Sequence, residues 1–383
     1  MQNDIAIVPI NVVSKILRAT AKNAIETNSI AKNIYIHGTM GVGKSAIVHQ
    51  LKDWVEQNTD KKAVVIDIRL SAMQSHDVLG IPYNAESGEM LEVDVDGEKK
   101  YVSLKNLYFS TPSWFPDTDD EETFYILFLD EFSNGSKDVQ QAAYRILLDR
   151  SIQNGKTMGT NTMIVAAGNL QSDNTGAKAI LPAASNRFSG HFQIDTDIAY
   201  KPWLDWALNE GDIYNEVFYY INADPQALID DDIKGRLSFA RPRTWEDVSD
   251  IMKNPEYKED EELLYTAIRG AIGTANTLKF KAFIENRKFL PNFEMLEKTG
   301  EFEVPEDLSA QLFIASPFAM RILANLKTGE DEALRNLTDA ALRLPKETRV
   351  VLVRALKLKK DLITKVLTNE HTKKLTRSIT ESM

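Results

Sequence analysis

Hydrophobic residues in the first two hundred positions form short, almost wholly apolar runs that alternate with stretches of helical spacing. Strands of a parallel sheet have this pattern, because helices cover both faces of the sheet. The pattern predicts an α/β fold with a parallel five-stranded sheet flanked by helices, preceded by a helix over about residues 12–26. The predicted strands are residues 34–37, 63–68, 124–129, 163–167 and 192–194.

Between the third and fourth of these strands, apolar residues recur at the spacing of one helix face. They are Val139, Ala142, Ala143, Ile146 and Leu147. Ser136 precedes them at the position of a helix N-cap, where its hydroxyl accepts a bond from a free main-chain N–H group. The segment is therefore predicted to be a strand-helix-strand unit.

Two segments interrupt the predicted α/β core, and both have the pattern of a β-hairpin. In each, an Asp-Gly or Asn-Gly pair lies between strand-like runs, which favours a two-residue turn. The turns fall at Asp96-Gly97 and Asn154-Gly155, within insertions at about 81–115 and 151–161. The first insertion is rich in aromatic residues, which could grip a polypeptide or pack on the protein's own surface.

After about residue 195 the strand pattern stops and helical segments dominate. They are predicted at 201–209, 244–252, 263–283, 318–326, 331–344 and 346–359. Since domains most often have roughly 100–200 residues, a chain of 383 residues is expected to form more than one unit. We expect an α/β domain at 1–196 followed by helical regions at 197–255 and 256–383, which the family resemblance described below implies to be a helical lid and a helical C-terminal extension.

The composition adds limits on partners and location. With 43% hydrophobic and 26% charged residues and no cysteine, the chain is typical of a folded protein of the reducing cytoplasm. No apolar run approaches the roughly 20 residues that cross a bilayer, so we expect a cytoplasmic protein without membrane contact. The net charge of -11 disfavours broad binding to nucleic acid. The basic stretch at 354–377 is interpreted as a solvated helix face.

The segment GTMGVGKS joins the first predicted strand to a helix, which is the context that gives a P-loop pattern structural meaning. Its glycines let successive N–H groups point at a phosphate, its lysine reaches the β- and γ-phosphates, and its serine hydroxyl binds Mg²⁺. The residues expected to contact ATP are Gly38, Thr39, Met40, Gly41, Val42, Gly43, Lys44, Ser45, Ala46 and Asp130.

Two adjacent acids end the most hydrophobic predicted strand, FYILFLDEF. Asp130 is predicted to support the Mg²⁺ ion together with Ser45, and Glu131 to orient or deprotonate the attacking water. ATP and Mg²⁺ are therefore the predicted cofactors. A guanine-specific Asn-Lys-x-Asp motif is missing from the sequence, which favours ATP over GTP. The five histidines show no HExxH spacing and no Gly-x-Ser-x-Gly elbow occurs, so neither a zinc hydrolase nor a serine hydrolase is indicated.

Over about residues 33–252 the sequence resembles AAA+ ATPases of the MoxR-like, helix-2-insert type found in bacteria, archaea and phages. The blocks that carry the resemblance are GTMGVGKS, RLSAMQSHDVLGIP, PSWFP, LFLDEF with DVQQAAYRILLDR, VAAGN, NRF and ARPRTWED. One departure is FSNGS after the acidic strand, where many relatives have an Asn-Arg pair.

The resemblance implies catalytic roles for three further residues. Asn169 matches sensor 1, which helps to place the hydrolytic water, and Arg187 matches the arginine finger that completes a neighbouring subunit's site. Arg243 matches sensor 2 on the helical lid, although Arg241 is close enough to be the alternative. The family also implies that the two hairpins face a central channel.

The resemblance implies a homo-oligomeric ring, expected to be hexameric, that remodels or matures a protein partner, often with a von Willebrand A domain protein. Two alternatives stay open. One is an AAA+ motor acting on nucleic acid, and the other is a nucleotide-gated scaffold without turnover, which the intact Lys44, Asp130 and Glu131 disfavour.

Overall fold

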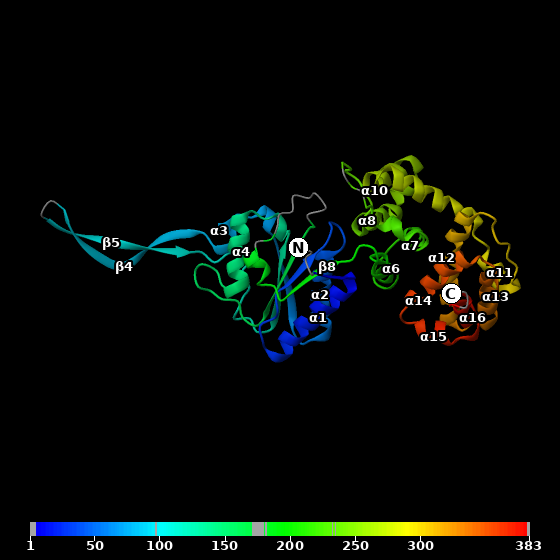
Figure 1. The fold of residues 1–383 in the computed structure, drawn as a ribbon, viewed down its shortest axis with the longest axis horizontal. Coiled ribbons are helices and arrows are strands. Elements are labelled where there is room, and N and C mark those ends of the chain that lie inside the picture. Colours follow the sequence, from blue (N-terminus) through cyan, green and yellow to red (C-terminus); the bar gives the residue numbers. More distant parts are fainter. Residues whose placement is uncertain are drawn as a thin grey trace. The chain divides into compact units, whose positions relative to one another are not determined.

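The computed structural model describes residues 5–95, 98–170, 180, 182–231, 233 and 235–380. The chain divides into two compact units, Met1–Asp195 and Thr196–Met383. The first combines a sheet with helices, whereas every regular element described in the second is a helix (Figure 1). Among the described residues, no helix is both long and apolar enough to cross a membrane.

The main sheet of the first unit has six parallel strands in the order β1-β8-β2-β7-β6-β3. Their bounds are β1 Ala6–Val8, β2 Ile34–His37, β3 Lys62–Arg69, β6 Thr123–Asp130, β7 Thr162–Gly168 and β8 Gly190–Ile194. All five predicted strands are present, so the predicted α/β class is confirmed. The prediction of five strands was one too few, because β1 is a three-residue edge strand with two exposed residues and no periodic signal.

Helices cover both faces of this sheet, as its apolar strands require. The bounds are α1 Ile10–Thr27, α2 Lys44–Asn58, α3 Ser75–Leu79, α4 Lys137–Asp149 and α5 Pro182–Ser185. On one face, α3, α4 and α5 pack on Tyr35, Leu127 and Ile164. On the other, α1 packs against α2, and α2 contacts β3, β6 and β7. Every residue of β7 is buried, which explains why its sequence is apolar after Thr162.

Helix α4 begins as predicted, with the Ser136 hydroxyl accepting a hydrogen bond from the Val139 N–H at 3.3 Å. It ends at Arg150, whose guanidinium donates to the Thr162 carbonyl at 2.6 Å. The second predicted hairpin follows directly. It is reduced to one antiparallel bridge, Ser151 to Thr157, around a turn in which Gly155 has a φ of +85°.

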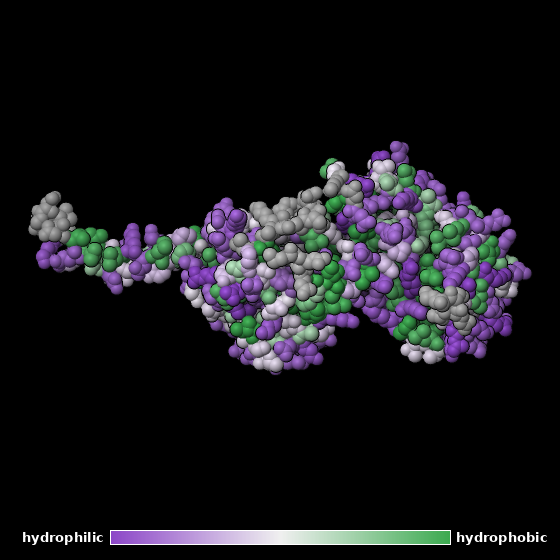
Figure 2. Space-filling model, viewed as in Figure 1, coloured by the Kyte–Doolittle hydropathy of each residue, from purple (hydrophilic) through white to green (hydrophobic). Residues whose placement is uncertain are grey.

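The first predicted hairpin is a long two-stranded arm, formed by β4 (Pro82–Val95) and β5 (Glu98–Phe109). Its predicted turn residues, Asp96 and Gly97, lie outside the described residues. Figure 1 shows the arm extending away from the sheet, and Figure 2 shows apolar and polar side chains alternating along it.

The two faces of this arm differ in chemistry. Residues paired directly across two strands share a face, so Tyr83 lies beside Tyr108 and Leu91 beside Val102. All four side chains are exposed, the least exposed at 42%. On the opposite face Glu92 pairs with Lys99 and accepts a hydrogen bond from the Tyr101 hydroxyl. Met90 and Leu107 also lie exposed on this second face, so the arm has exposed apolar side chains on both faces and the Glu92–Lys99 ion pair on one.

The second unit is a helical array around one hydrophobic core. Its helices are α6 Tyr200–Asn209, α7 Asn215–Ala223, α8 Pro242–Lys253, α9 Pro255–Lys258, α10 Glu261–Ile284, α11 Phe293–Thr299, α12 Leu308–Thr328, α13 Asp331–Leu342, α14 Lys346–Leu358, α15 Ile363–Thr368 and α16 Glu370–Thr380. The core runs without a break from Trp203 through Trp245, Phe280 and Phe318 to Leu375. Segments 197–255 and 256–383, expected as lid and extension, thus share one core.

Two helices of this unit depart from the sequence pattern. The helix expected from residue 318 begins ten residues earlier, and α12 continues through Pro317, because Phe313, Ile314 and Phe318 on either side are all buried. In α10 the backbone leaves helical geometry at Gly273, where φ is +80°. A side chain there would meet the Ser238 carbonyl oxygen at 2.8 Å, so the kink requires glycine.

Candidate functional site

The P-loop connects the carboxyl end of β2 to α2, as the sequence predicts. Gly41 and Gly43 have φ values of +72° and +98°, in the left-handed region that glycine adopts without steric cost. Gly43 is the N-cap of α2. Since glycine has no side chain to bond the first N–H groups of the helix, these groups and the helix dipole are directed at an anionic ligand.

Lys44, the first residue of α2, is buried and folds back over the loop. Its ammonium group donates to the carbonyl oxygens of Gly38 and Thr39 at 2.7 and 2.9 Å. It also donates to Asn169 Oδ1 at 2.9 Å. The loop therefore holds a desolvated positive charge between the carboxyl ends of β2 and β7, where a phosphate would be attracted to it.

Ser45 and Asp130 form the second part of the site. The Ser45 hydroxyl donates to Asp130 Oδ2 at 3.0 Å, which joins the start of α2 to the end of β6. The other carboxylate oxygen of Asp130 accepts the Glu131 main-chain N–H at 2.8 Å. A hydroxyl and a carboxylate facing each other are hard oxygen donors of the kind that Mg²⁺ prefers.

Glu131 follows Asp130 in an unusual backbone conformation. Its φ of +52° lies in the left-handed region, which a non-glycine residue adopts at a cost of order 1–3 kcal/mol. The turn orients its side chain toward Ser71, whose hydroxyl donates to Glu131 Oε2. Glu131 is thus held at the sheet edge by a residue at the end of the neighbouring strand β3.

Asn169 lies directly after β7 and is fixed from two sides. Its side-chain oxygen accepts from Lys44, and its main-chain N–H donates to the Ser133 hydroxyl at 3.1 Å. The preceding Gly168 is packed so tightly that a Cβ atom there would lie 2.0 Å from Tyr35 Oη. Only glycine therefore fits between β2 and the acidic turn at this point.

A pair of histidines lies directly beneath the P-loop. His37, the last residue of β2, contacts His191 of β8 through Nε2 and Nδ1 at 3.0 Å, and His191 contacts the Ser185 carbonyl oxygen at 3.0 Å. Burial, followed by the neighbouring His191 and Lys44, lowers the pKa of His37 from its usual 6.5 to about 4. His37 is therefore neutral at physiological pH.

Acidic groups gather at the same edge of the sheet. Burial and the nearby Asp130 raise the pKa of the Asp67 carboxyl, which lies on β3 with its side chain 3.8 Å from His49. Asp67, Asp130 and Glu131 make this edge electronegative. Such a field concentrates divalent cations at the site.

Arg187 lies just beyond α5, on the surface of the first unit. Its guanidinium donates to the Tyr144 hydroxyl at 3.1 Å and lies 5.5 Å from the centre of that ring on α4. The Asn33 side-chain amide donates a hydrogen bond to the main-chain carbonyl oxygen of Arg187. The contacts of Arg187 are thus with α4 and not with the cluster around Lys44.

Arg241 and Arg243 differ sharply in environment, although one residue separates them. Arg241 is 4% exposed, and its guanidinium donates to the carbonyl oxygens of Asp230 at 2.5 Å and Ala240 at 2.9 Å. Arg243 is exposed on the first turn of α8. Arg241 stabilises the fold of the second unit, while Arg243 extends into solvent.

The structure brings Lys44, Ser45, Asp130 and Asn169 into one cluster of two hydrogen-bonded pairs, Lys44–Asn169 and Ser45–Asp130, with Glu131 beside it. Arg187 lies apart from this cluster, and Arg243 belongs to the second unit. The supporting residues Ser71 and Ser133 were not predicted. Ser71 falls inside the block RLSAMQSHDVLGIP, and its position two residues past the end of β3 was the available signal.

ATP and Mg²⁺ fit the residues at this site. The glycine-lined loop and uncapped helix start suit a polyphosphate, the buried Lys44 suits its charge, and Ser45 with Asp130 suits a hard cation. When bound, Mg²⁺ would neutralise the developing phosphate charge.

No family model matches the sequence, and no curated protein matches it. Similar solved structures include the RuvB Holliday junction branch migration motor of Thermotoga maritima, at 15% identity over 76% of this chain and 74% of that chain with a TM-score of 0.36. The Orc1 protein of Aeropyrum pernix in complex with DNA is 14% identical over 95% and 86%, with a TM-score of 0.37. PCH-2 of C. elegans is 16% identical over 79% and 66%, with a TM-score of 0.33. At these values the similarities support no conclusion about ligand or partner.

Proposed function

We propose that this chain is an AAA+ ATPase that binds ATP with Mg²⁺ at the carboxyl ends of β2, β6 and β7 and hydrolyses its γ-phosphate. The observation that carries the proposal is the cluster of Lys44, Ser45, Asp130 and Asn169. Four residue types needed for phosphoryl transfer meet there from three separate parts of the sequence.

Each side chain in the cluster has a task in this reaction. Lys44 exchanges the carbonyls of Gly38 and Thr39 for phosphate oxygens, and keeps its charge compensated throughout. Glu131 accepts a proton from the attacking water, and Asn169 positions that water while its main chain stays fixed by Ser133.

The first test is ATP turnover with Mg²⁺. Lys44→Ala should reduce turnover by about 10³-fold or more, because the phosphates lose their principal cation. Lys52→Ala is the matched control, since Lys52 lies on the same helix but pairs with Glu56 at the surface. Equal turnover by wild type and Lys44→Ala would refute the proposal.

The arrangement of Arg187 supports a site completed by a neighbouring subunit in a ring. Its guanidinium rests on Tyr144 at the surface, away from its own P-loop, where a second subunit could receive it. We expect Lys44→Ala and Arg187→Ala each to be inactive alone. Co-expressed, they should recover about a quarter of wild-type turnover, because one site in four would combine an intact Lys44 with a neighbour's Arg187. Zero recovery in verified mixed oligomers would contradict a role in trans.

The helical lid is proposed within residues 197–255, with Arg243 as its contact to nucleotide. This proposal is supported by the difference between the two arginines. The Arg241 guanidinium is hydrogen-bonded to main-chain carbonyl oxygens of its own unit, whereas Arg243 is exposed. The remaining helices, 256–383, share its core and are proposed to move with it.

We further propose a protein substrate, in keeping with a MoxR-like remodelling role. The exposed apolar side chains of the β4–β5 arm suit a polypeptide better than a polyanion. The basic stretch at 354–377 gives little support to nucleic acid, since Arg354, Lys360 and Lys365 are already bonded to Asn222, Asp205 and Leu326.

Two measurements separate the substrate classes. Glu131→Gln with ATP should trap the loaded assembly, so a pull-down should recover a protein, including any von Willebrand A domain partner. The arm variant Tyr83→Ser/Tyr108→Ser should lose this partner and keep basal turnover. Stimulation of turnover by DNA at low salt, with no protein captured, would favour the nucleic-acid motor instead.

A further inference from the structure

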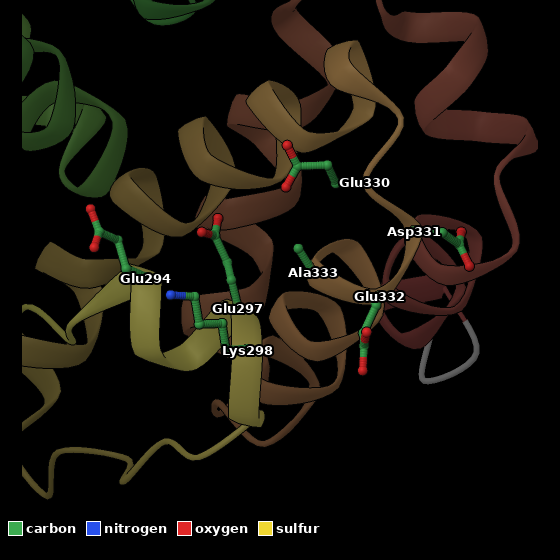
Figure 3. A pocket seen from close by; sticks show the side chains of 7 residues that line it. All are labelled: Glu294, Glu297, Lys298, Glu330, Asp331, Glu332 and Ala333. Carbon is green, nitrogen blue, oxygen red and sulfur yellow. The ribbon is translucent and has the colours of Figure 1, made fainter.

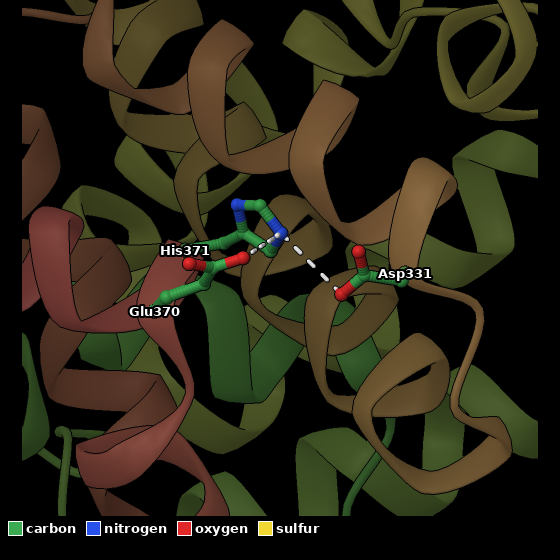
Figure 4. Close-up of side chains that lie close together, drawn as sticks. All are labelled: Asp331, Glu370 and His371. Carbon is green, nitrogen blue, oxygen red and sulfur yellow. Dashed lines mark ion pairs between the residues drawn. The ribbon is translucent and has the colours of Figure 1, made fainter.

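Three side chains converge where two helices of the second unit begin (Figure 4). Asp331 is the first residue of α13, and Glu370 and His371 are the first two residues of α16. Each offers one possible ligand atom, and these atoms lie within 4.8 Å of one another. Both carboxylates are exposed, whereas the imidazole is only 6% exposed.

The contacts of the His371 ring are not those of an ordinary ion pair. Asp331 Oδ1 and Glu370 Oε1 lie 3.4 and 3.5 Å from the same atom, Nε2. A charge-assisted hydrogen bond would be about 2.7–2.9 Å long. Neither ring nitrogen has a hydrogen-bond partner among the described residues, so a side chain that is nine-tenths buried is directed at two carboxylates without bonding either one.

The same distances suit three ligands of one metal ion. Zinc lies about 2.0–2.2 Å from an imidazole nitrogen or a carboxylate oxygen. Two such ligands at a tetrahedral angle are therefore about 3.4 Å apart. The two measured separations from Nε2 agree with this value.

We propose that Asp331, Glu370 and His371 bind a divalent transition-metal ion of the zinc class. Imidazole nitrogen with carboxylate oxygen is a ligand set that Zn²⁺ accepts. Both carboxylates are first residues of their helices. Since both are exposed, the fourth position is open to water.

The main chain holds the ligands in place without the metal. Asn369 precedes α16, and its side-chain oxygen accepts the N–H groups of His371 at 2.9 Å and Thr372 at 3.3 Å. The Thr372 hydroxyl donates to the Val366 carbonyl oxygen in the buried core. The imidazole therefore emerges from a capped helix start, and the metal would join α16 to α13.

An acidic cavity of about 420 Å³ adjoins this cluster and would attract cations to it (Figure 3). Five carboxylates line it and one ammonium group, Lys298, opposes them. Glu297 accepts two bonds from Arg321 at 2.5 and 2.6 Å, and Glu332 lies 4.0 Å from Arg335. The lining residues are Glu294, Glu297, Lys298, Glu330, Asp331, Glu332 and Ala333.

The test is calorimetric titration of the full chain with Zn²⁺, after removal of any histidine tag and of nucleotide. An Asp130→Asn background removes the Mg²⁺ site from the measurement. We expect one Zn²⁺ per chain in that background. Changing a residue that supports a metal ligand typically weakens binding about 10–100-fold, so His371→Gln, Asp331→Asn and Glu370→Gln should each weaken it at least that much.

Glu332→Gln is the matched control, because it removes a charge from the same helix turn and the same cavity without contacting His371. It should bind Zn²⁺ like the background protein. If all four variants bind alike, or if Zn²⁺ does not bind, the site is an ion pair and the proposal is wrong.

Two further measurements distinguish loss of metal binding from misfolding of His371→Gln. Zn²⁺ should raise the melting temperature of the background protein, and Co²⁺ should give the visible absorption of a tetrahedral site. Both signals should vanish in Asp331→Asn and Glu370→Gln, whose side chains are exposed and whose folding is not at risk. Their persistence in these two variants would overturn the assignment.

Discussion

The P-loop cluster and the His371 cluster both place charged groups where helices begin, but they satisfy those charges differently. Lys44 donates to two main-chain carbonyls and to Asn169, and Asp130 accepts from Ser45 and from the main chain. In the second unit, two carboxylates approach one buried imidazole without bonding it. The charges of the first cluster are thus paired within the protein, whereas the buried imidazole of the second is not hydrogen-bonded to either carboxylate, as a proposed cation site requires.

The largest effect that we predict is the loss of turnover when Glu131, beside the P-loop cluster, is changed. Glu131→Gln keeps the size of the side chain but cannot accept a proton, so turnover should fall about 10²–10⁴-fold with little change in the KM for ATP. Ser71→Ala should have a smaller effect in the same direction, since Ser71 only orients Glu131. Steady-state ATPase assays check both, and unchanged turnover in Glu131→Gln would remove its assigned role.

The next largest effect separates the two arginines of α8. Arg241→Ala should lower the free energy of unfolding of the second unit by about 2–3 kcal/mol, because two buried carbonyls lose a charged donor. Arg243→Ala should change it by less than about 0.5 kcal/mol, as is usual at the surface. Urea denaturation followed by tryptophan fluorescence measures both. Equal losses would show that Arg243 also supports the fold.

A third prediction concerns the close packing next to Asn169. Gly168→Ala forces a methyl group against Tyr35 Oη and should destabilise the first unit by about 1–3 kcal/mol, with a parallel loss of turnover. Adding Tyr35→Phe removes the clashing oxygen and should recover part of both losses. If the double variant is no more stable and no more active than Gly168→Ala, the strain does not come from the contact with the Tyr35 hydroxyl.

The smallest effect is pH dependence of stability at His37. Because burial lowers its pKa from 6.5 to about 4, its neutral form is favoured by folding. The resulting stability is complete above about pH 6.5 and is lost as pH falls toward 4. The loss should be about 1–2 kcal/mol, allowing for partial exposure of the ring.

Denaturation curves of wild type and His37→Gln between pH 4 and 7 would measure this loss. The difference between them should shrink as pH falls, whereas His76→Gln, an exposed control, should follow wild type. A constant difference would show that His37 does not titrate in this range.

The residues that the sequence predicts for a nucleotide site lie at or near the carboxyl ends of strands. Asp130 ends one apolar strand and Asn169 directly follows another, whereas Lys44 begins the helix after the glycine-rich loop that leaves β2. Parallel strands bring such positions to one edge of the sheet. Ser71, Ser133 and His191 were missed, since their roles depend on which strands are neighbours. The order of the strands in the sheet cannot be predicted from the hydrophobic periodicity of the sequence.

The metal cluster shows the same limit more clearly. Glu370 and His371 are adjacent in the sequence, but Asp331 belongs to a different helix, and only the packing of α13 against α16 unites them. The start of α12 was missed for a related reason, because α12 continues through Pro317, where tertiary burial outweighs the local penalty of proline.

The attachment of the β4–β5 arm has a consequence for how this protein can diverge. The arm leaves and rejoins the domain at one point, where Ser110 donates its main-chain N–H to Ile81 and accepts the Ile81 N–H on its hydroxyl, each at 3.0 Å. Gly80 passes so close to Ser110 that no side chain fits there. A change of length or sequence within the arm therefore leaves its point of attachment at Ile81 and Ser110 unaltered.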